Sequence, residues 1–259
     1  MKSDQSNLDS GDEVARWDRL AVGGWDYSVE QFWFHSNLLY PALQAPLTRI
    51  SPRLTLDFGC GPGHLMTHLA DAGFVCEGYD PAAEMADRAR GGSGAVVYSD
   101  IDEVPSGVYD LVVANAVLSA VSDLRSAIAA IGGLLREGGS LVMSIPHPVF
   151  ALLDEIHTTT ERRWIRPDDG ESGVWKYLGR PVQSVRWGDG LPSTSLYHRT
   201  LGDYGAVLAG CGFVITEVIE PVPAESAAAS NPSLYEIFSK IPGFLIIVAR
   251  LGRAGGVGS

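Results

Sequence analysis

The chain has 259 residues, of which 46% are hydrophobic and 19% charged, and its formal net charge is −12. This length can bury one large core, so we expect a single elaborated domain. The negative charge repels phosphate backbones and argues against DNA or RNA as the main partner, which leaves a neutral or cationic small molecule. No apolar run approaches the roughly 20 residues of a membrane-spanning helix, and the polar N-terminus is unlike a signal peptide. We therefore expect a cytoplasmic monomer or homodimer with no membrane partner.

The cysteine content and the spacing of metal-binding residue types argue against a metal site. The three cysteines are too few and too isolated for a disulfide framework or a zinc site. The sequence contains no H-E-x-x-H motif, no paired Cys-x-x-Cys motif and no cluster of carboxylates. We expect no metal.

The most informative segment is 54–73, LTLDFGCGPGHLMTHLADAG, which begins as a short strand and ends as an amphipathic helix. Glycines without side chains let a nucleoside-bearing ligand lie against the backbone at a helix N-terminus. A dinucleotide-binding fingerprint needs glycines at the first, third and sixth positions, but the sixth position is His64. This disfavours an NAD-dependent oxidoreductase. The loop instead carries a G-x-G-x-G pattern at Gly59, Gly61 and Gly63.

Strand and helix patterns alternate along most of the chain. Alternating elements of this length predict a parallel, doubly wound sheet. Further helices are expected at 81–92, from Ser122 to about 135, at 200–211 and at 232–239. The expected strands are 54–58, 74–80, 95–98, 108–117, 140–145, 213–220 and 244–251.

Residues 147–198 interrupt this alternation, because they lack helical periodicity and contain many prolines, glycines and aromatic residues. We interpret them as an insertion of irregular strands over the edge of the sheet. All six tryptophans lie outside residues 53–146, three in the N-terminal segment and three in the insertion. The tryptophans either line a pocket or form a small satellite core beneath those segments.

Five motifs resemble, in order and spacing, the type 11 family of class I S-adenosylmethionine-dependent methyltransferases. They are LDFGCGPG, GYDPAAEMADRAR, SDIDEVP, YDLVVANAVLSAVSD and LREGGSLVMSIPHP. The resemblance implies an α/β, Rossmann-like doubly wound sheet of seven strands, with the last strand antiparallel to its neighbours. It also implies an N-terminal helical lid (residues 1–50) and an S-adenosylmethionine-binding domain (residues 51–259) that includes a cap insertion after strand five (residues 147–198).

The resemblance implies a role for three acidic residues in binding S-adenosyl-L-methionine. Asp57 would accept a hydrogen bond from the ammonium group of the cofactor, directly or through water. Asp80, 21 residues after Gly59, would accept both ribose hydroxyls. Asp100 would pair with the adenine amino group. The alternative is that these acids cap helices or lie on the surface.

Backbone and apolar contacts complete the expected cofactor site. The Ile101 amide would serve an adenine nitrogen, and the backbone of Asn115 and Ala116 would touch the cofactor amino group. Met85 would pack on adenine, or else belong to the helix core. Tyr27 would wall the methionine end, or else pack the lid. The remaining expected cofactor contacts are Gly59, Cys60, Gly61, Gly63 and Pro81.

Methyl transfer from a sulfonium is an in-line displacement, in which orientation alone can supply roughly 7 to 11 kcal/mol. A base is therefore optional, although a histidine beside a hydroxyl acceptor would contribute on the order of 10²- to 10⁴-fold. His147, directly after strand five, is one candidate base, with a structural role as the alternative. His35, in the lid, is the second. Members of the family often carry a histidine shortly after strand four, and LSAVSD has none here.

These features predict a methyltransferase that acts on a small-molecule acceptor, with O-methylation of a specialised metabolite as the leading hypothesis. One alternative is a cyclase or rearrangement enzyme that keeps the cofactor bound and uses its sulfonium as a fixed charge. A second alternative is a non-catalytic scaffold subunit.

Overall fold

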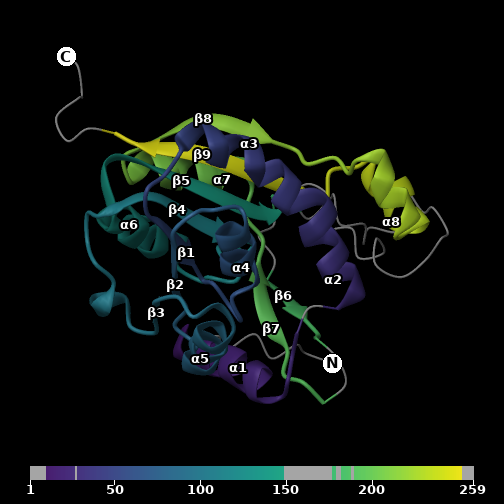
Figure 1. Ribbon diagram of the computed structural model, residues 1–259, viewed down its shortest axis with the longest axis horizontal. Coiled ribbons are helices and arrows are strands. Elements are labelled where there is room, and N and C mark those ends of the chain that lie inside the picture. Colours follow the sequence, from purple (N-terminus) through teal and green to yellow (C-terminus); the bar gives the residue numbers. More distant parts are fainter. Residues whose placement is uncertain (1–9, 27, 149–176, 179–181, 188–189, 253–259) are drawn as a thin grey trace.

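A seven-stranded sheet with the order β3-β2-β1-β4-β5-β9-β8 forms the centre of the molecule (Figure 1). The computed structural model describes residues 10–26, 28–148, 177–178, 182–187 and 190–252. Neighbouring strands are parallel except for β9, which is antiparallel to both β5 and β8. The strands are β1 (Thr55–Phe58), β2 (Cys76–Tyr79), β3 (Val97–Tyr98), β4 (Tyr109–Asn115), β5 (Leu135–Pro146), β8 (Phe213–Ile219) and β9 (Phe244–Leu251). The predicted doubly wound, seven-stranded architecture is confirmed.

Helices cover both faces of this sheet. The helices α3 (Tyr40–Ile50) and α4 (His64–Asp71) bury their leucines against one face, and α5 (Ala83–Ser93) packs beside α4. The helices α6 (Leu124–Leu134) and α7 (Leu201–Gly210) cover the other face. Six of the seven residues of β4 are buried, as expected for a central strand covered on both sides.

The N-terminal segment folds as three helical pieces that lead into α3. These are α1 (Ser10–Val22), α2 (Val29–Phe34) and a single π-helical turn, η1 (His35–Leu39). A capping box at Ser28 starts α2, because its hydroxyl accepts from the Gln31 amide while the Gln31 side chain accepts from the Ser28 amide. Single π-turns inside helices frequently occur at functional sites, and this one begins at His35.

A short hairpin lies outside the main sheet and contacts the N-terminal segment. Its strands are β6 (Val182–Val185) and β7 (Thr194–Tyr197). The buried carboxylate of Glu13 in α1 accepts a hydrogen bond from the Ser195 amide at 2.8 Å. Next to this bond, Trp17, Trp25 and Trp187 form an aromatic cluster with ring centroids 5.2–5.9 Å apart. These three tryptophans therefore form a satellite core between α1, α5 and the hairpin.

The remaining short elements lie after β3 and between β8 and β9. They are the 3-10 turns η2 (Ile101–Glu103) and η4 (Glu225–Ala229) and the helix α8 (Pro232–Phe238). Trp33, Phe34 and Phe238 pack together between α2 and α8. Two of the six tryptophans, Trp164 and Trp175, lie outside the described residues.

Two predictions about the ends of α6 were wrong. Asp123, rather than Ser122, is the N-cap of α6, because its carboxylate accepts from the Ser126 amide. Leu135 begins β5 instead of ending α6, because it pairs in register with Tyr109 across the sheet. Among the described residues, no helix combines the length and the apolarity that crossing a bilayer requires.

Candidate active site

The glycine loop connects β1 to α4 at the carboxyl edge of the sheet. The amides of Gly59 and Cys60 both donate to the Tyr79 carbonyl, which ties the loop to the end of β2. Gly59 has φ +75°, and a Cβ there would lie 2.3 Å from the Val117 side chain, so only glycine fits. Gly61 has φ +52° and open space in front of it. The loop thus offers bare backbone at the position where the sequence predicts the cofactor.

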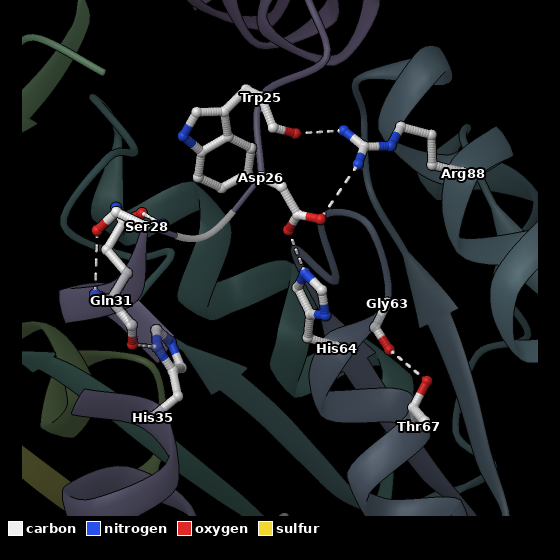
Figure 2. A network of polar contacts seen from close by, with 9 residues as sticks. All are labelled: Trp25, Asp26, Ser28, Gln31, His35, Gly63, His64, Thr67 and Arg88. Atoms are coloured by element: carbon white, nitrogen blue, oxygen red, sulfur yellow. Dashed lines mark hydrogen bonds and ion pairs between the residues drawn. The ribbon is translucent and has the colours of Figure 1, made fainter. Parts of the chain in front are cut away.

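Gly63 closes this loop as the N-cap of α4. Its carbonyl accepts from the Thr67 hydroxyl at 3.2 Å (Figure 2). Cys60 lies beneath the loop with 6% of its surface exposed, and burial raises the pKa of its thiol far above the usual range. A thiol that stays protonated is a packing group and not a nucleophile.

Asp57 is the most unusual acid of the site. It is 1% exposed, and its Oδ2 atom has no hydrogen-bond partner among the described residues. Burial, followed by the nearby Asp80 charge, raises the pKa of Asp57 to about 8. A buried polar group without a partner costs about 1–3 kcal/mol, so such atoms usually serve a ligand or water.

Asp80, in contrast, is integrated in the loop. Its carboxylate oxygens accept from the Gly61 amide at 2.8 Å and from the Ala82 amide at 2.9 Å. Burial raises the pKa of Asp80 to about 6, against the opposing effect of these two bonds. Each oxygen retains a lone pair for a further donor. The capping alternative thus describes part of the role of Asp80 and leaves room for ribose hydroxyls.

Asp100 is exposed and also acts as a cap, because its carboxylate accepts from the Asp102 amide at the start of η2. Both Asp80 and Asp100 lie close enough to Tyr79 to contribute, after burial, to raising the pKa of its phenol to about 12. Asp100 and Asp80 therefore lie at the same edge of the sheet. Ile101 is partly buried beside them, and Pro81 is exposed.

The end of β4 is held by Ser144 of β5. The Ser144 hydroxyl donates to the Asn115 side-chain oxygen at 2.7 Å, and it accepts from the Ala116 amide at 2.9 Å. Ala116 has φ +58°, a left-handed conformation that non-glycine residues rarely adopt. Backbone strain of this kind, of order 1–3 kcal/mol, clusters at ligand-binding sites.

The N-terminal segment is attached beside the glycine loop by a polar network (Figure 2). The Asp26 carboxylate lies 2.6 Å from His64 Nε2 and 3.8 Å from an Arg88 guanidinium nitrogen. Arg88 also donates to the Trp25 carbonyl. His64 is the first residue of α4, so this network ties the segment directly to the cofactor loop. Tyr27, the predicted wall of the methionine end, lies outside the described residues.

Met85 lies in the aromatic cluster below this segment. It is 1% exposed and packs with Leu20, Trp25 and Ala82. Met85 therefore lies in the helix core, which the sequence analysis gave as the alternative to packing on adenine.

His35 lies on the same side of the site, on the π-turn. Its Nδ1 atom is 2.8 Å from the Gln31 carbonyl, which can only accept, so Nδ1 carries the proton and Nε2 is the accepting nitrogen (Figure 2). Burial, as the largest effect, lowers the pKa of His35. The ring is therefore neutral at physiological pH, with its tautomer fixed.

His147 lies at the other end of the site, after β5. Its Nε2 atom is 3.1 Å from a carboxylate oxygen of Glu220, and its amide donates to the Gly243 carbonyl. A small hollow opens here, lined by residues that include Ser119, Pro146, Pro148, Leu196, Tyr197 and Tyr204. The prolines on both sides of His147 line this hollow, and His147 does not, because its ring turns toward Glu220.

Sequence reasoning missed several residues of this region. Tyr40, Asp26 and Glu220 lie in none of the five motifs. Arg88 lies in the second motif, but a charged residue on a helix has the same pattern as a solvated surface. Within the described residues, no group of three histidine, cysteine or acidic side chains is arranged to hold a metal ion.

A seven-stranded sheet with one reversed strand, a bare glycine loop and acids at the ends of consecutive strands defines a class I S-adenosylmethionine-dependent methyltransferase. A family model described as a methyltransferase domain matches residues 37–218. The chain therefore belongs to the methyltransferase domain family, as the motifs predicted.

Individual relatives agree with this class. An uncharacterized methyltransferase of Mycobacterium tuberculosis is 31% identical over 44% of this chain and 61% of its own length. A ubiquinone biosynthesis O-methyltransferase of Pectobacterium atrosepticum is 24% identical over 74% of this chain and 86% of that protein. The crystal structure of an S-adenosylmethionine-dependent methyltransferase from Mesorhizobium loti superposes with a TM-score of 0.63 at 26% identity, covering 82% of this chain and 96% of that one.

Proposed function

We propose that this enzyme methylates a hydroxyl oxygen of a small, neutral or cationic acceptor, a specialised metabolite, held between the N-terminal lid (residues 1–50) and the cap (residues 147–198). The contact between α1 and the β6–β7 hairpin supports the proposal that the lid and the cap enclose the acceptor together, because the two segments meet in one aromatic cluster. The name of the Pectobacterium relative, an O-methyltransferase, agrees with oxygen as the acceptor atom. The net charge of −12 disfavours an anionic acceptor.

The residues at the carboxyl edge of the sheet fit the cofactor. The Asp57 oxygen that bonds to none of the described residues suits its ammonium group. The remaining lone pairs of Asp80 suit its ribose hydroxyls, and the open backbone at Gly61 leaves room for its chain. Asp100 with Ile101 would hold the adenine, and Asn115 with Ala116 the amino acid end. When bound, S-adenosylmethionine supplies an electrophilic methyl group on a positively charged sulfur.

The observation that carries the choice of oxygen is the state of His35. A phenol or alcohol must lose its proton during transfer, and a neutral imidazole with a fixed tautomer can accept it at Nε2. Burial keeps the pKa of His35 below its ordinary value, so the ring is ready to accept a proton at neutral pH. An amine acceptor, already nucleophilic when neutral, has less need of such a base.

His147 suits this role less well. Its ring turns away from the hollow toward Glu220, and its backbone amide anchors the loop to Gly243. We assign it to holding the end of β5, which was the structural alternative left open by the sequence.

The test is incubation of the purified protein with radiolabelled S-adenosylmethionine and a panel of phenols, alcohols and amines of matched size. Label on oxygen, with one S-adenosylhomocysteine formed per product, is the expected result. Label on nitrogen or carbon only would contradict the choice of oxygen. Conversion of an acceptor without S-adenosylhomocysteine would favour the cyclase or rearrangement alternative.

A further inference from the structure

Three buried side-chain oxygens on one side of the sheet have no hydrogen-bond partner among the described residues. They are Tyr40 Oη, Thr55 Oγ1 and Asp57 Oδ2. Buried polar atoms are nearly always hydrogen-bonded in native proteins, so three such atoms on one side of the sheet indicate a missing polar partner. Asp57 belongs to the predicted cofactor site, but the motifs do not include Tyr40.

Strand register places these atoms on the same face. Thr55 and Asp57 are two residues apart on β1, so their side chains point to the same side. Their register partners on β4 are Leu111 and Val113. Both partners belong to the core cluster under α3 and α4, against which Tyr40 packs. The phenol and the carboxylate therefore share one layer of the molecule.

The ring of Tyr40 is fixed from two sides. It stacks on His68 of α4, with centroids 4.4 Å apart and an interplanar angle of 18°. The edge contact with His35 has a centroid separation of 5.6 Å. Tyr40 also stands at the junction of the π-turn and α3, where the backbone leaves little freedom. The hydroxyl is thus held in place without using its hydrogen bonds.

We propose that the Tyr40 hydroxyl, together with the Asp57 carboxylate, binds the amino group of the cofactor. The hydroxyl can accept one N–H of the ammonium group, and the carboxylate can accept another. The negative charge of Asp57 selects an amine over the carboxylate of the same ligand, which it would repel. This inference depends on the cofactor site described above, and it adds a residue of the N-terminal segment to it.

The electrostatic environment supports this assignment. Burial, and after it the charge of Asp57, raises the pKa of Tyr40 above its usual range, so the phenol is protonated and can donate. The carboxylate itself carries an unfavourable charge in the absence of a cation. A bound ammonium would satisfy both groups at once.

The test compares two ligands on the Tyr40→Phe variant by calorimetry. S-adenosylhomocysteine carries the amino acid end, whereas 5′-methylthioadenosine lacks it. We expect Tyr40→Phe to weaken S-adenosylhomocysteine about tenfold and to leave 5′-methylthioadenosine within twofold of wild type. Equal loss for both ligands, or no loss for either, would overturn the proposal.

Tyr109→Phe is the matched control, because the Tyr109 hydroxyl is also buried but bonds to Glu77 at the opposite end of β4. This control should lower the melting temperature and leave both affinities unchanged. Tyr40→Phe should not lower the melting temperature, since it removes a hydroxyl that bonds to none of the described residues. A fall as large as that of Tyr109→Phe would show a structural role and overturn the proposal.

The same titrations separate this inference from the proposed reaction. If the wild-type protein binds S-adenosylhomocysteine but methylates no hydroxyl, the proposed function fails while the selective effect of Tyr40→Phe still supports the amine site. If the wild-type protein does not bind S-adenosylhomocysteine at all, the amine site fails with it.

Discussion

The two ends of the candidate site use their polar groups differently. On the lid side, Asp57 and Tyr40 have oxygens with no hydrogen-bond partner in the described part of the chain, and the His35 ring is held through the nitrogen that faces its own helix. On the cap side, His147 has a carboxylate on its ring and a carbonyl on its amide. The lid side therefore has the binding capacity that a ligand must satisfy, while the polar groups around His147 stabilise the fold.

One residue of the cap side does not follow this division. The Tyr197 hydroxyl is buried without a partner among the described residues, and its residue lines the hollow beside Pro146 and Pro148. The polar groups of the site thus fall into two sets, those with unused hydrogen-bonding capacity that a ligand can fill and those that hold the backbone. Tyr197 belongs to the first set.

The largest effect is expected when the two ends of the site are compared through the kcat values of the variants His35→Gln and His147→Gln. A glutamine at 35 can keep the bond to the Gln31 carbonyl but cannot accept a proton, so kcat for a hydroxyl acceptor should fall about 10²-fold or more. His147→Gln should lower kcat less than tenfold. Steady-state kinetics with S-adenosylhomocysteine affinity measured in parallel checks both, and equal losses would remove the distinction between the two ends.

The next largest effect is expected for Asp57→Asn. Removing the charge that faces the ammonium group should weaken S-adenosylhomocysteine about a hundredfold, because truncating one partner of a buried charge pair costs about 2–5 kcal/mol. Calorimetry measures this loss. Asp87→Asn, on the exposed side of α5, is the control and should bind normally. An Asp57→Asn variant with wild-type affinity would mean that the carboxylate does not face the ligand.

The same variant should be more stable than the wild type without ligand. The pKa of Asp57 is raised to about 8 in the folded state, so its contribution is favourable below its unfolded pKa and is lost as pH rises through 8. The gain in melting temperature of Asp57→Asn should therefore grow between pH 5 and pH 8.5. Thermal scans without ligand measure it, and a gain independent of pH would contradict the raised pKa.

The affinity of the wild-type protein for the cofactor should depend on the protonation state of Asp57. Below pH 8 the Asp57 carboxyl must lose a proton before it can face an ammonium, so affinity should rise by up to about tenfold per pH unit toward pH 8. Tyr40, Cys60 and Cys76 nearby all have raised pKa values and stay protonated in this range. Asp80, with a pKa of about 6, should add to the slope only at lower pH. Asp57→Asn should remove the slope above pH 6.5.

The smallest effect is expected from Asp26→Asn in the network at the glycine loop. Its ion pairs with His64 and Arg88 are exposed, and such pairs contribute about 0.2–1 kcal/mol each. We expect S-adenosylhomocysteine to dissociate two- to fivefold faster, with less difference at high salt. Displacement kinetics checks this, and an unchanged rate would mean that the network does not retain the lid.

The sequence predicted the sheet well because its strands are short, apolar and separated by clear turn residues. The last two strands, expected at 213–220 and 244–251, were placed to within one residue. The boundary at Leu135 was wrong because a leucine eleven residues after Leu124 continues the helical pattern. Only the pairing of Leu135 with Tyr109 shows that this residue belongs to β5.

The site was predictable where it is local and not where it depends on tertiary packing. The glycine loop and its acids lie within or just after consecutive strands, so the motifs locate them. Tyr40 is the first residue of α3 and precedes Asp57 by 17 residues, so only packing shows that their side chains share one layer of the molecule. Whether an acid is buried with an oxygen that bonds to none of the described residues, as Asp57 is, also depends on what covers it.

The bond from the Ser195 amide to buried Glu13, together with the tryptophans around it, fastens the first helix to the hairpin of the cap. In the enclosure proposed above, α1 and the hairpin would therefore have to move together to admit a ligand. The methyl donor and the acceptor would then enter by the same motion of the backbone, and the contact between α1 and the hairpin would set the order in which they bind.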